Sequence, residues 1–357
     1  MNHNNTTLDI CDNDFTYDRF VLVSKIIWHT SGFICFIIGI PGHIFHIIIL
    51  SNKTNRKEFT SLYFITISIC ELIFLIGALW LWTASMSLIK YDPREVLSCG
   101  IFHCIILGST TLSNLYLASI AIDRSIMILC PMSYRSIVTR PRVIFRLILI
   151  CLIVILLLVP NYFYLHYNAK ATLFLCDFSS SNNRQRIHLL SLMHALFFVS
   201  IPSLIVCISS IILLNNRCQH KHIYKKTLSL SARRMHKRSI LTFLVSLWFF
   251  FSLLPAFVVE IFVLCDQYFY RDMHCLLRMK IYKILLNCFL ILLAMNYSTK
   301  FYIHLIISTS FRDDFIQFIS CQNNQNSLES RRMNNKNNNE LRLLPLLNQN
   351  PTKATEI

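Results

Sequence analysis

Seven long apolar blocks constrain this chain more than any other feature of its sequence. Each block approaches or exceeds the ~20 residues that a helix needs to cross a hydrocarbon core, and few of the blocks hold a charge. Of the 357 residues, 54% are hydrophobic and 15% are charged, which is too apolar for a soluble domain of this size. The sequence therefore predicts an all-α membrane protein, a seven-transmembrane helix bundle. The blocks are 26–50, 61–84, 100–129, 143–165, 188–214, 239–264 and 281–307.

Basic residues in short loops predict the orientation of the bundle, because such residues collect on the cytoplasmic side of a membrane. The loops after the first, third and fifth blocks are basic, and residues 217–239 hold eight Lys or Arg and no acid. The alternate loops balance their bases with acids such as Asp92 and Asp177. We therefore expect a multi-pass plasma-membrane protein whose amino terminus is extracellular.

The net charge of +16 belongs mostly to the predicted cytoplasmic face. There it would lie against anionic lipid, so the bilayer rather than a nucleic acid is the expected partner of these bases. Residues 1–25 are polar and lack a basic start followed by an apolar stretch, so no cleavable signal peptide is expected. The expected organisation is an extracellular arm at 1–25, a seven-transmembrane domain at 26–309, an amphipathic membrane-surface helix at 310–321 and a disordered cytoplasmic tail at 322–357.

The end of the third block carries the sequence Ala121-Ile122-Asp123-Arg124-Ser125, and Pro131-Met132 follows in the next loop. This pattern resembles the rhodopsin-like (class A) G-protein-coupled receptors, whose third helix ends in Asp-Arg-Tyr before a proline of the second inner loop. An Asp-Arg pair alone would be weak evidence for this family, because charged residues are ordinary at a helix end.

Other residues stand at positions that the same resemblance expects. Cys99 and Cys176 occupy the family's positions for a disulfide between the third helix and the second outer loop. Pro202 and Pro255 lie inside the fifth and sixth blocks, where a helix-interior proline frees a carbonyl and kinks the helix. Beyond the seventh block, the segment around Phe311 resembles the family's amphipathic surface helix.

The chain also departs from the family's pattern. Gly-Asn of the first helix is Gly42-His43 here, and the membrane aspartate of the second helix is Glu71. The tyrosine after Asp-Arg is Ser125, and the tryptophan before the proline of the sixth helix is Leu253. Asn-Pro-x-x-Tyr of the seventh helix becomes Lys300-Phe301-Tyr302-Ile303-His304. The chain resembles a divergent, peptide-receptor-like member of that family.

The resemblance implies a conformational relay from an extracellular ligand to a heterotrimeric G protein. Arg124 is expected to face the inner mouth of the bundle, held by Asp123 until the G protein enters. The alternative is an arginine that snorkels to the membrane surface and anchors the helix end. The implied coupling and switch residues are Asp123, Arg124, Pro131, Met132, Pro255 and His304.

The ligand is predicted less closely. Receptors for biogenic amines hold the amine with an aspartate where this chain has Ile106, which favours a peptide over an amine. Glu260 would be a counter-charge for a basic peptide, or else an ordinary carboxylate near the outer membrane boundary. The candidate pocket residues are His103, Ile106, His194, Glu260 and Asn287.

Other classes of function remain as alternatives. The intramembrane polar residues show no nucleophile–base spacing, so no enzyme activity, cofactor or metal is expected. His43 and His46 lie three apart on one helix, and we interpret them as packing residues rather than metal ligands. A transporter would show paired broken helices and a channel a shared polar face, and neither pattern is evident. The stronger alternative is a receptor-like protein that binds a ligand or partner without activating a G protein.

The most specific prediction concerns the sodium pocket that such receptors commonly form at mid-membrane. Its matching positions here are Glu71, Ser113, Asn296 and Lys300. Because isolated charges at bilayer depth are costly, we expect Glu71 and Lys300 to form an ion pair. Ser113 and Asn296 would supply hydrogen bonds to it. The alternative is that Lys300 lies deeper and snorkels to the cytoplasm.

Three modifications are expected on the loops and termini. Cys99 and Cys176 form a disulfide by the family's pattern, and a second bridge would join Cys265 to Cys275 or Cys11 to one of them. Asn4 and Asn5 both stand in N-glycosylation sequons. Cys321 follows the predicted surface helix and is a palmitoylation candidate.

Overall fold

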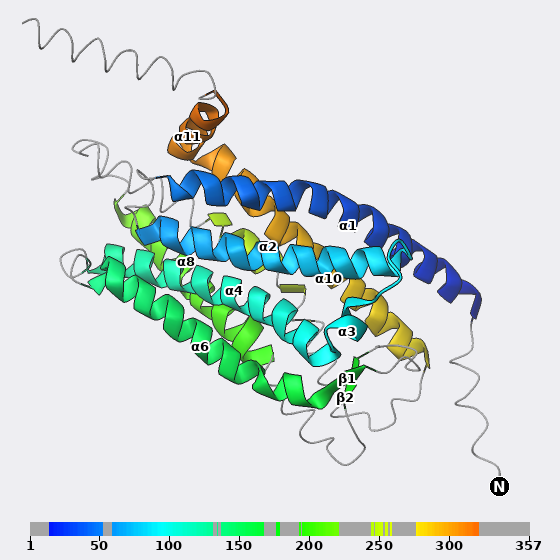
Figure 1. The fold of residues 1–357 in the computed structure, drawn as a ribbon. Helices are drawn as coiled ribbons and strands as arrows, with labels where there is room; N and C mark the ends of the chain where they lie inside the picture. Colours follow the sequence, from blue (N-terminus) through cyan, green and yellow to red (C-terminus); the bar gives the residue numbers. More distant parts are fainter. Residues whose placement is uncertain are drawn as a thin grey trace, which may run out of the picture. The chain divides into compact units, whose positions relative to one another are not determined.

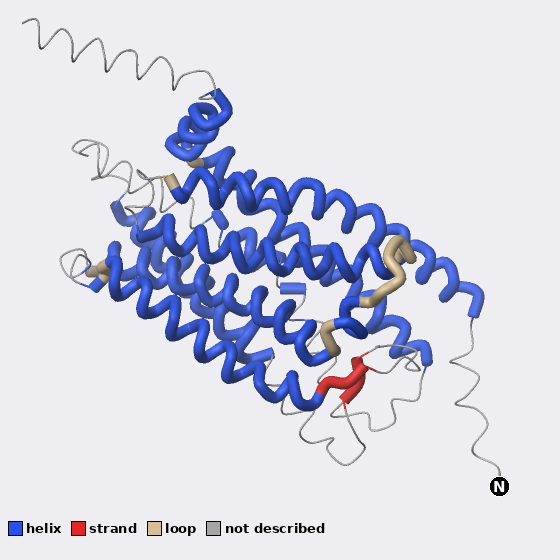
Figure 2. The backbone as a smooth tube through the Cα atoms, in the orientation of Figure 1, coloured by secondary structure: helices blue, strands red, loops and turns tan. Residues whose placement is uncertain are grey.

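Long helices dominate the protein. Figure 2 shows them in blue, with one short pair of strands at one end of the bundle. The computed structural model describes residues 14–52, 59–130, 134, 137–167, 176–178, 193, 195–220, 244–245, 247–252, 254–255, 258 and 276–320.

The helices follow the apolar blocks in chain order, as Figure 1 shows. The sixth block contributes helical residues at 244–245, 247–252, 254–255 and 258. Between the fourth and fifth blocks, β1 and β2 pair antiparallel, with His166 opposite Asp177. The elements are α1 (Asp14–Ser51), α2 (Phe59–Ser85), α3 (Pro93–Val96), α4 (Cys99–Leu129), α6 (Arg140–Tyr164), β1 (Leu165–Tyr167), β2 (Cys176–Phe178), η3 (Ala195–Ser200), α8 (Ile201–His220), α10 (Leu276–Ile307) and α11 (Thr309–Ser320).

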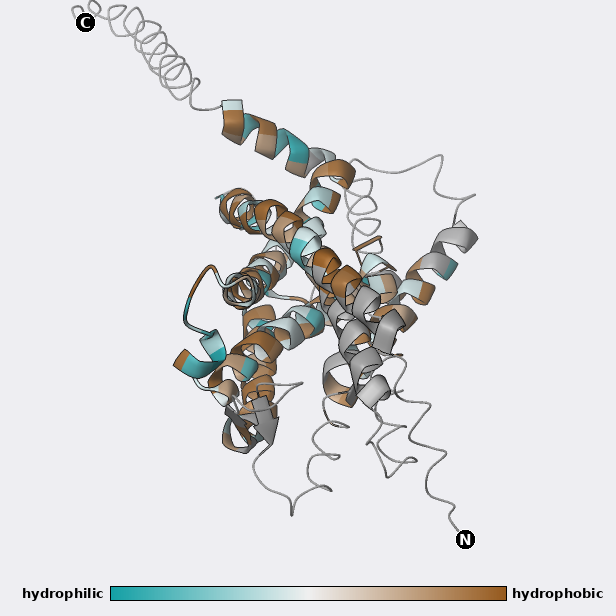
Figure 3. Ribbon diagram, turned by 90° about the vertical axis from the view of Figure 1, so that its right-hand side faces the viewer, coloured by the Kyte–Doolittle hydropathy of each residue, from teal (hydrophilic) through white to brown (hydrophobic). Residues whose placement is uncertain are grey.

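Four helical segments of the described residues are long and apolar enough to cross a membrane: Ile26–Ser51, Phe59–Ser85, Cys99–Met127 and Arg140–Pro160. Shorter apolar helices cover Ile201–Leu213 and Ile291–Ile307. Much of the described helical ribbon in Figure 3 is brown, the colour of hydrophobic residues. Large apolar side chains remain exposed along these helices, which is the arrangement expected of surfaces that face lipid tails.

Helix packing gives α4 the central position. It packs against α2, α6 and α8, while α1 packs against α2 and α10. Small residues let some backbones approach closely. Gly100 of α4 lies against the Tyr162 carbonyl of α6, and a Cβ there would stand 2.6 Å from that oxygen. Gly39 of α1 makes room for Ser298 of α10, whose hydroxyl donates to the Cys35 carbonyl at 2.9 Å.

The end of the bundle that contains Cys99 is here called the Cys99 end. Capping side chains account for the start of two helices there. Ser98 is the N-cap of α4, and its hydroxyl accepts from the Ile101 backbone N–H at 3.4 Å. Asp92 caps α3 and also binds the Arg94 guanidinium. Burial raises the pKa of the Asp92 carboxyl, but the hydrogen bonds and charge of Arg94 outweigh this and hold its pKa below the ordinary value.

The structure adds details that the apolar blocks did not predict. The helix α1 begins at Asp14, inside the polar segment expected as an arm, because a helix satisfies its own backbone hydrogen bonds and can continue into water. A π-helical segment, η3, precedes Pro202 in the fifth block. Pro202 lacks a backbone N–H and so cannot donate to the preceding turn.

The helix α11 belongs to a second compact unit that starts at Thr309, whereas the first unit ends at Ser308. Phe311, Phe315 and Phe318 are spaced i, i+4 and i+7 and share one side of the helix, whereas Asp313, Gln317 and Ser320 share the opposite side. This spacing gives the helix an apolar side and a polar side, so α11 is amphipathic.

Candidate functional site

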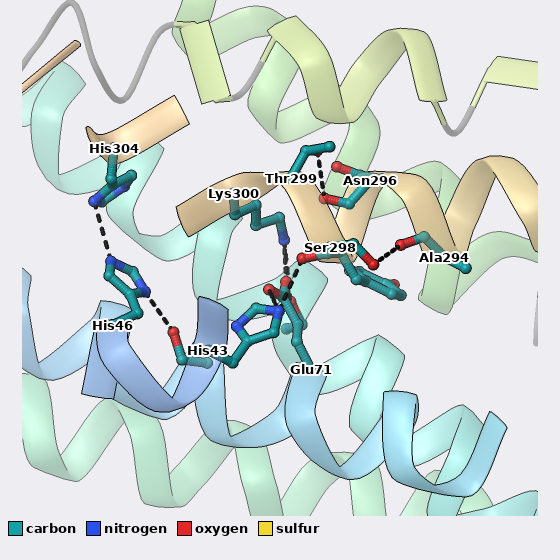
Figure 4. Close-up of polar contacts among 12 residues, drawn as sticks. His43, His46, Glu71, Ala294, Asn296, Ser298, Thr299, Lys300 and His304 are labelled. Carbon is teal, nitrogen blue, oxygen red and sulfur yellow. Dashed lines mark hydrogen bonds and ion pairs between the residues drawn. The ribbon is translucent and has the colours of Figure 1, made fainter. Parts of the chain in front are cut away.

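Glu71 and Lys300 form an ion pair between α2 and α10, in which the Lys300 ammonium donates to Glu71 Oε1. Both side chains are buried, at 1% and 5% exposure. Lys300 therefore does not extend to the surface, as the snorkelling alternative required. Figure 4 shows the ammonium pointing at the Glu71 carboxylate. A buried carboxylate and ammonium compensate each other's charge in a place where either alone would be costly.

Neighbouring groups complete the environment of this pair. The Ser113 hydroxyl of α4 donates to Glu71 Oε1 at 2.5 Å, and the Lys300 ammonium lies 3.4 Å from the same hydroxyl. The ammonium also lies 5.0 Å from the centre of the Tyr297 ring, within the range of a cation–π contact. The pair thus joins three helices at one point.

His43 adds a link from α1 to the same point. Its Nε2 lies 2.8 Å from the Tyr297 carbonyl and 3.6 Å from Glu71 Oε2. Because a carbonyl only accepts, Nε2 carries the proton. Tyr297 is fully buried, and its hydroxyl donates to Asn114 Oδ1 at 3.3 Å. We call Glu71, Lys300, Ser113, His43 and Tyr297 the mid-bundle cluster.

A second histidine contact joins α1 to α10. His46 Nε2 lies 3.2 Å from His304 Nδ1, and His46 Nδ1 lies 2.6 Å from the Ser68 hydroxyl of α2. Figure 4 shows the His46 and His304 rings facing each other. One proton bridges the two facing nitrogens, so one ring is the donor and the other the acceptor. Both nitrogens of His46 are satisfied, in keeping with its interpretation as a packing residue.

Asn296 does not supply the hydrogen bond to the ion pair that was predicted for it. Neither atom of its side-chain amide has a hydrogen-bond partner within the described part of the chain, although the residue is fully buried. Its backbone carbonyl instead accepts from the Thr299 hydroxyl at 3.2 Å. The prediction failed because family spacing fixes the turn of the helix but not the rotamer. The Lys300 side chain is long enough to reach Glu71 and Ser113 without the amide.

The end of the bundle that contains Arg124, the Arg124 mouth, holds a second set of polar contacts. Arg124 is 5% exposed, and its Nη2 donates to the Thr60 hydroxyl of α2 at 2.6 Å. Asp123 accepts from Arg146 Nη1 of α6 at 2.5 Å and from the Tyr63 hydroxyl at 3.2 Å. Arg124, Thr60, Asp123 and Tyr63 line a small pocket together with Tyr134, whose phenol has its pKa raised by burial.

The expectation that Asp123 holds Arg124 differs from this arrangement. Among the described residues no ion pair joins the two side chains, and Arg146 and Tyr63 occupy the two carboxylate oxygens. Adjacent residues on a helix do not face each other, so each side chain takes its partners from neighbouring helices. The expectation that Arg124 faces inward agrees with its burial.

Of the predicted ligand-pocket residues, two are described with their side chains. Ile106 lies against Gly77 of α2 and fills the space that a Cβ at that glycine would need. His103 is half-buried on α4. Asn287 lies on α10, with its side chain outside the described residues. His194 and Glu260 lie outside the described residues.

The remaining predicted sites are described in part. Cys99 is disulfide-bonded, while Cys176 is placed by its backbone in β2 and its side chain is not described. The pairing of these two cysteines therefore stays a prediction. Pro255 is helical and exposed. Within the described residues no three His, Cys, Asp or Glu side chains are placed to hold a metal ion. Outside the described residues lie Pro131, Met132, Asn4, Asn5, Cys321, Cys11, Cys265 and Cys275.

In a comparison with models of protein families, residues 42–311 match the model of the family described as 7 transmembrane receptor (rhodopsin family). The match covers most of the chain, which therefore belongs to this family of seven-transmembrane receptors. It is a multi-pass membrane protein, and the predicted fold class and family are confirmed. A search among curated proteins finds no significant match.

Sequence reasoning missed several residues of both polar clusters. Arg146, Thr60 and Tyr63 were not singled out from the sequence. Their signal was weak, because a hydroxyl or an arginine near a helix end is common in membrane proteins. Arg146 is the one Lys or Arg of the fourth block, but Arg140 and Arg142 just before it were equal candidates for pairing with Asp123.

Proposed function

We propose that the protein is a receptor that transmits the binding of an extracellular ligand to a heterotrimeric G protein by helix rearrangement. The observation that carries this proposal is the buried Arg124 at the end of α4, in a chain of the rhodopsin family. Its guanidinium is held inside the bundle by the neutral Thr60 hydroxyl, a bond that a rearrangement can exchange for another acceptor. The loops at this end carry most of the basic charge, which supports a cytoplasmic orientation and an extracellular amino terminus.

A recruitment assay tests this proposal. The full chain is expressed in cells with a panel of labelled Gα subunits, and recruitment is measured by energy transfer before and after addition of a pool of basic peptides. We expect recruitment of at least one Gα and its loss in Arg124→Ala. Arg94→Ala removes an arginine at the Cys99 end and serves as the matched control, with recruitment unchanged. Equal signals from wild type and Arg124→Ala for every Gα would contradict the proposal.

The proposed ligand is a basic, neuropeptide-like molecule rather than an amine. Ile106 supports this, because an apolar side chain packed on Gly77 offers no carboxylate to an ammonium at the position where amine receptors have one. Glu260 is the proposed counter-charge. We expect Glu260→Gln to weaken the response to basic peptides while cell-surface expression is unchanged. An equal response would remove Glu260 from the proposal.

The mid-bundle cluster favours a second candidate, a receptor that binds its ligand without activating a G protein. Glu71–Lys300, His43–Tyr297 and His46–His304 all fasten α10 to α1 or α2. If these contacts prevent the rearrangement, wild type at the cell surface recruits no Gα, and Lys300→Met together with Glu71→Gln gains recruitment. If coupling proceeds without movement of α10, wild type recruits Gα and the double variant does not exceed it.

We also propose that the Lys300 ammonium stands where related receptors bind sodium. Its contacts with Glu71, Ser113 and the Tyr297 ring leave the carboxylate already neutralised. Replacing sodium chloride by choline chloride at constant ionic strength should therefore leave the melting temperature of the purified protein unchanged. Stabilisation by sodium that Glu71→Gln abolishes would show that a sodium site persists.

A further inference from the structure

The residues between α2 and α4, here called the α2–α4 loop (86–98), expose large apolar side chains at the Cys99 end. Leu88 and Tyr91 are 68% and 61% exposed, and Met86, Ile89 and Val96 are also exposed. A concentration of exposed apolar side chains usually marks a contact with another molecule or with a membrane. The loop is therefore a candidate interaction surface.

The way α2 ends fixes the start of this loop. The Ser87 N–H donates to the Ala84 carbonyl at 3.0 Å, and the Leu88 N–H donates to the Thr83 carbonyl at 3.1 Å. With Ser87 at φ 57°, in the left-handed region, these two bonds make a Schellman motif. The apolar residue after such a turn frequently packs back on its own helix, but Leu88 remains exposed. The backbone therefore fixes Leu88 in a position where its side chain stays accessible.

The rest of the loop is tied to the bundle by its backbone. The Trp80 indole N–H of α2 donates to the Tyr91 carbonyl at 3.4 Å. Asp92 then caps α3, which packs against both α2 and α4 and contains the buried Pro93. Figure 1 shows α3 beside the neighbouring ends of α2 and α4. The exposed side chains are therefore presented on an ordered frame of backbone hydrogen bonds.

Helix lengths place this loop at the level of the lipid headgroups. The 27 residues of α2 and the 31 residues of α4 span ~40 Å and ~46 Å at ~1.5 Å per residue. The hydrocarbon core is only ~30 Å thick, whereas the bilayer with its headgroups measures ~40–45 Å. Helices of these lengths that are centred in the bilayer end among the headgroups. The loop that joins them lies at the same level.

The residue types of the loop fit this level of the membrane. Tyrosine and tryptophan, here Tyr91 and Trp80, are enriched where a bilayer meets water, because each has an apolar ring and a polar atom. Lys90 is exposed between Ile89 and Tyr91, and a lysine covers apolar surface with its stem while its ammonium reaches phosphate or water. Contact with acyl chains would remove Leu88 and Ile89 from water, which is favourable in proportion to the apolar area buried.

We propose that the α2–α4 loop anchors the receptor in the leaflet at the Cys99 end, with Leu88, Ile89 and Tyr91 inserted at the boundary between headgroups and acyl chains. The partner is the phospholipid itself. The anchor adds a membrane contact beyond the spans and fixes the depth of the adjoining ends of α2 and α4. This inference does not depend on the proposed coupling to a G protein.

Site-specific fluorescence quenching tests the anchor. A genetically encoded fluorescent amino acid replaces Leu88 in the full chain, which is reconstituted in nanodiscs of phosphatidylcholine with or without brominated acyl chains. We expect brominated lipid to lower the emission about two- to threefold, because a side chain inserted ~5–10 Å into the boundary between headgroups and acyl chains meets the bromine atoms. The same probe at Glu95, an exposed polar position of α3, should be quenched by iodide in water and little by brominated lipid.

A matched pair of variants separates insertion of these side chains from simple proximity to the membrane. With the probe in place of Tyr91, Leu88→Ser combined with Ile89→Ser should abolish most of the quenching by brominated lipid and increase the quenching by iodide. Leu156→Ser removes an apolar side chain of α6 that is 70% exposed, and it should leave both signals unchanged. Melting temperatures show that each variant is folded. If the double variant does not fold, the probes at positions 88 and 95 decide the question by themselves.

Three results would overturn the inference. If iodide quenches position 88 as strongly as position 95 and brominated lipid does not quench it, the loop lies in water. If both quenchers fail at position 88, another segment of the chain or a second copy covers the apolar side chains. If brominated lipid still quenches position 91 fully in the double variant, Leu88 and Ile89 do not hold the loop in the membrane.

Discussion

The two polar clusters of the bundle compensate charge in opposite ways. In the mid-bundle cluster the opposite charges of Glu71 and Lys300 meet in a closed, buried arrangement that joins α2 to α10. At the Arg124 mouth, Asp123 is paired with Arg146, which is 29% exposed, while Arg124 is bound by hydroxyl and sulfur. The first arrangement resists change because separating its charges leaves both uncompensated. The second can exchange partners, which suits a site that must respond to another protein.

The largest expected effect comes from removing one partner of the buried pair. Lys300→Ala leaves Glu71 uncompensated and should lower the free energy of unfolding by ~3–5 kcal/mol. Glu71→Ala with Lys300→Ala should cost less than the single change, because no charge is then left alone. Thermal unfolding of purified protein and cell-surface yield measure both. A double variant less stable than Lys300→Ala would show that the two side chains contribute independently.

The pair at the Arg124 mouth should be weaker and more sensitive to salt. A double-mutant cycle of Asp123→Asn and Arg146→Gln should give a coupling free energy of ~1–2 kcal/mol, below that of Glu71 and Lys300. Raising the ionic strength should reduce this coupling, since part of Arg146 reaches solvent, but not that of the buried pair. If the coupling free energies of the two pairs fell equally with ionic strength, the expected difference in solvent screening between the two clusters would be contradicted.

The His46 contact should contribute less than either ion pair. Ser68→Ala removes a neutral hydrogen-bond partner of His46 and should lower the free energy of unfolding by ~1 kcal/mol. Ser61 is another buried serine of α2, about two turns from Ser68. Ser61→Ala is the comparison for the loss of a buried hydroxyl. Thermal melting of both variants measures the difference. An effect of Ser68→Ala as large as that of Lys300→Ala would place His46 among the principal anchors of α10.

The half-buried Asp92–Arg94 pair, at 19% and 24% exposure, gives the smallest expected effect. Its carboxyl has a folded-state pKa below the ordinary value, so its contribution is present above pH ~4 and is lost as the pH falls through the lowered pKa. Asp92→Asn should therefore lower stability by only ~0.2–1 kcal/mol at neutral pH. The melting temperatures of wild type and variant should converge in acid. A difference that grows on acidification would contradict this assignment.

The helices could be predicted from the sequence because each span must be continuously apolar. The Glu71–Lys300 contact could be anticipated because two intramembrane positions of the family carry charges here, and charges at that depth require partners. The partner of Asp123 could not be anticipated, since several basic residues lie at the same membrane boundary and sequence distance does not rank them. The strands β1 and β2 were also missed, because a three-residue strand has too little pattern to detect.

The Glu71–Lys300 contact also has a consequence for the order of events during synthesis. The two residues lie 229 positions apart, so at ~5–20 residues per second the ribosome makes Lys300 roughly 10–50 seconds after Glu71. Over that interval the second span resides in the membrane, or beside the translocation machinery, with its carboxylate still waiting for a counter-ion. A chain that stops before residue 300 therefore keeps Glu71 without its counter-ion, a state that is costly at membrane depth.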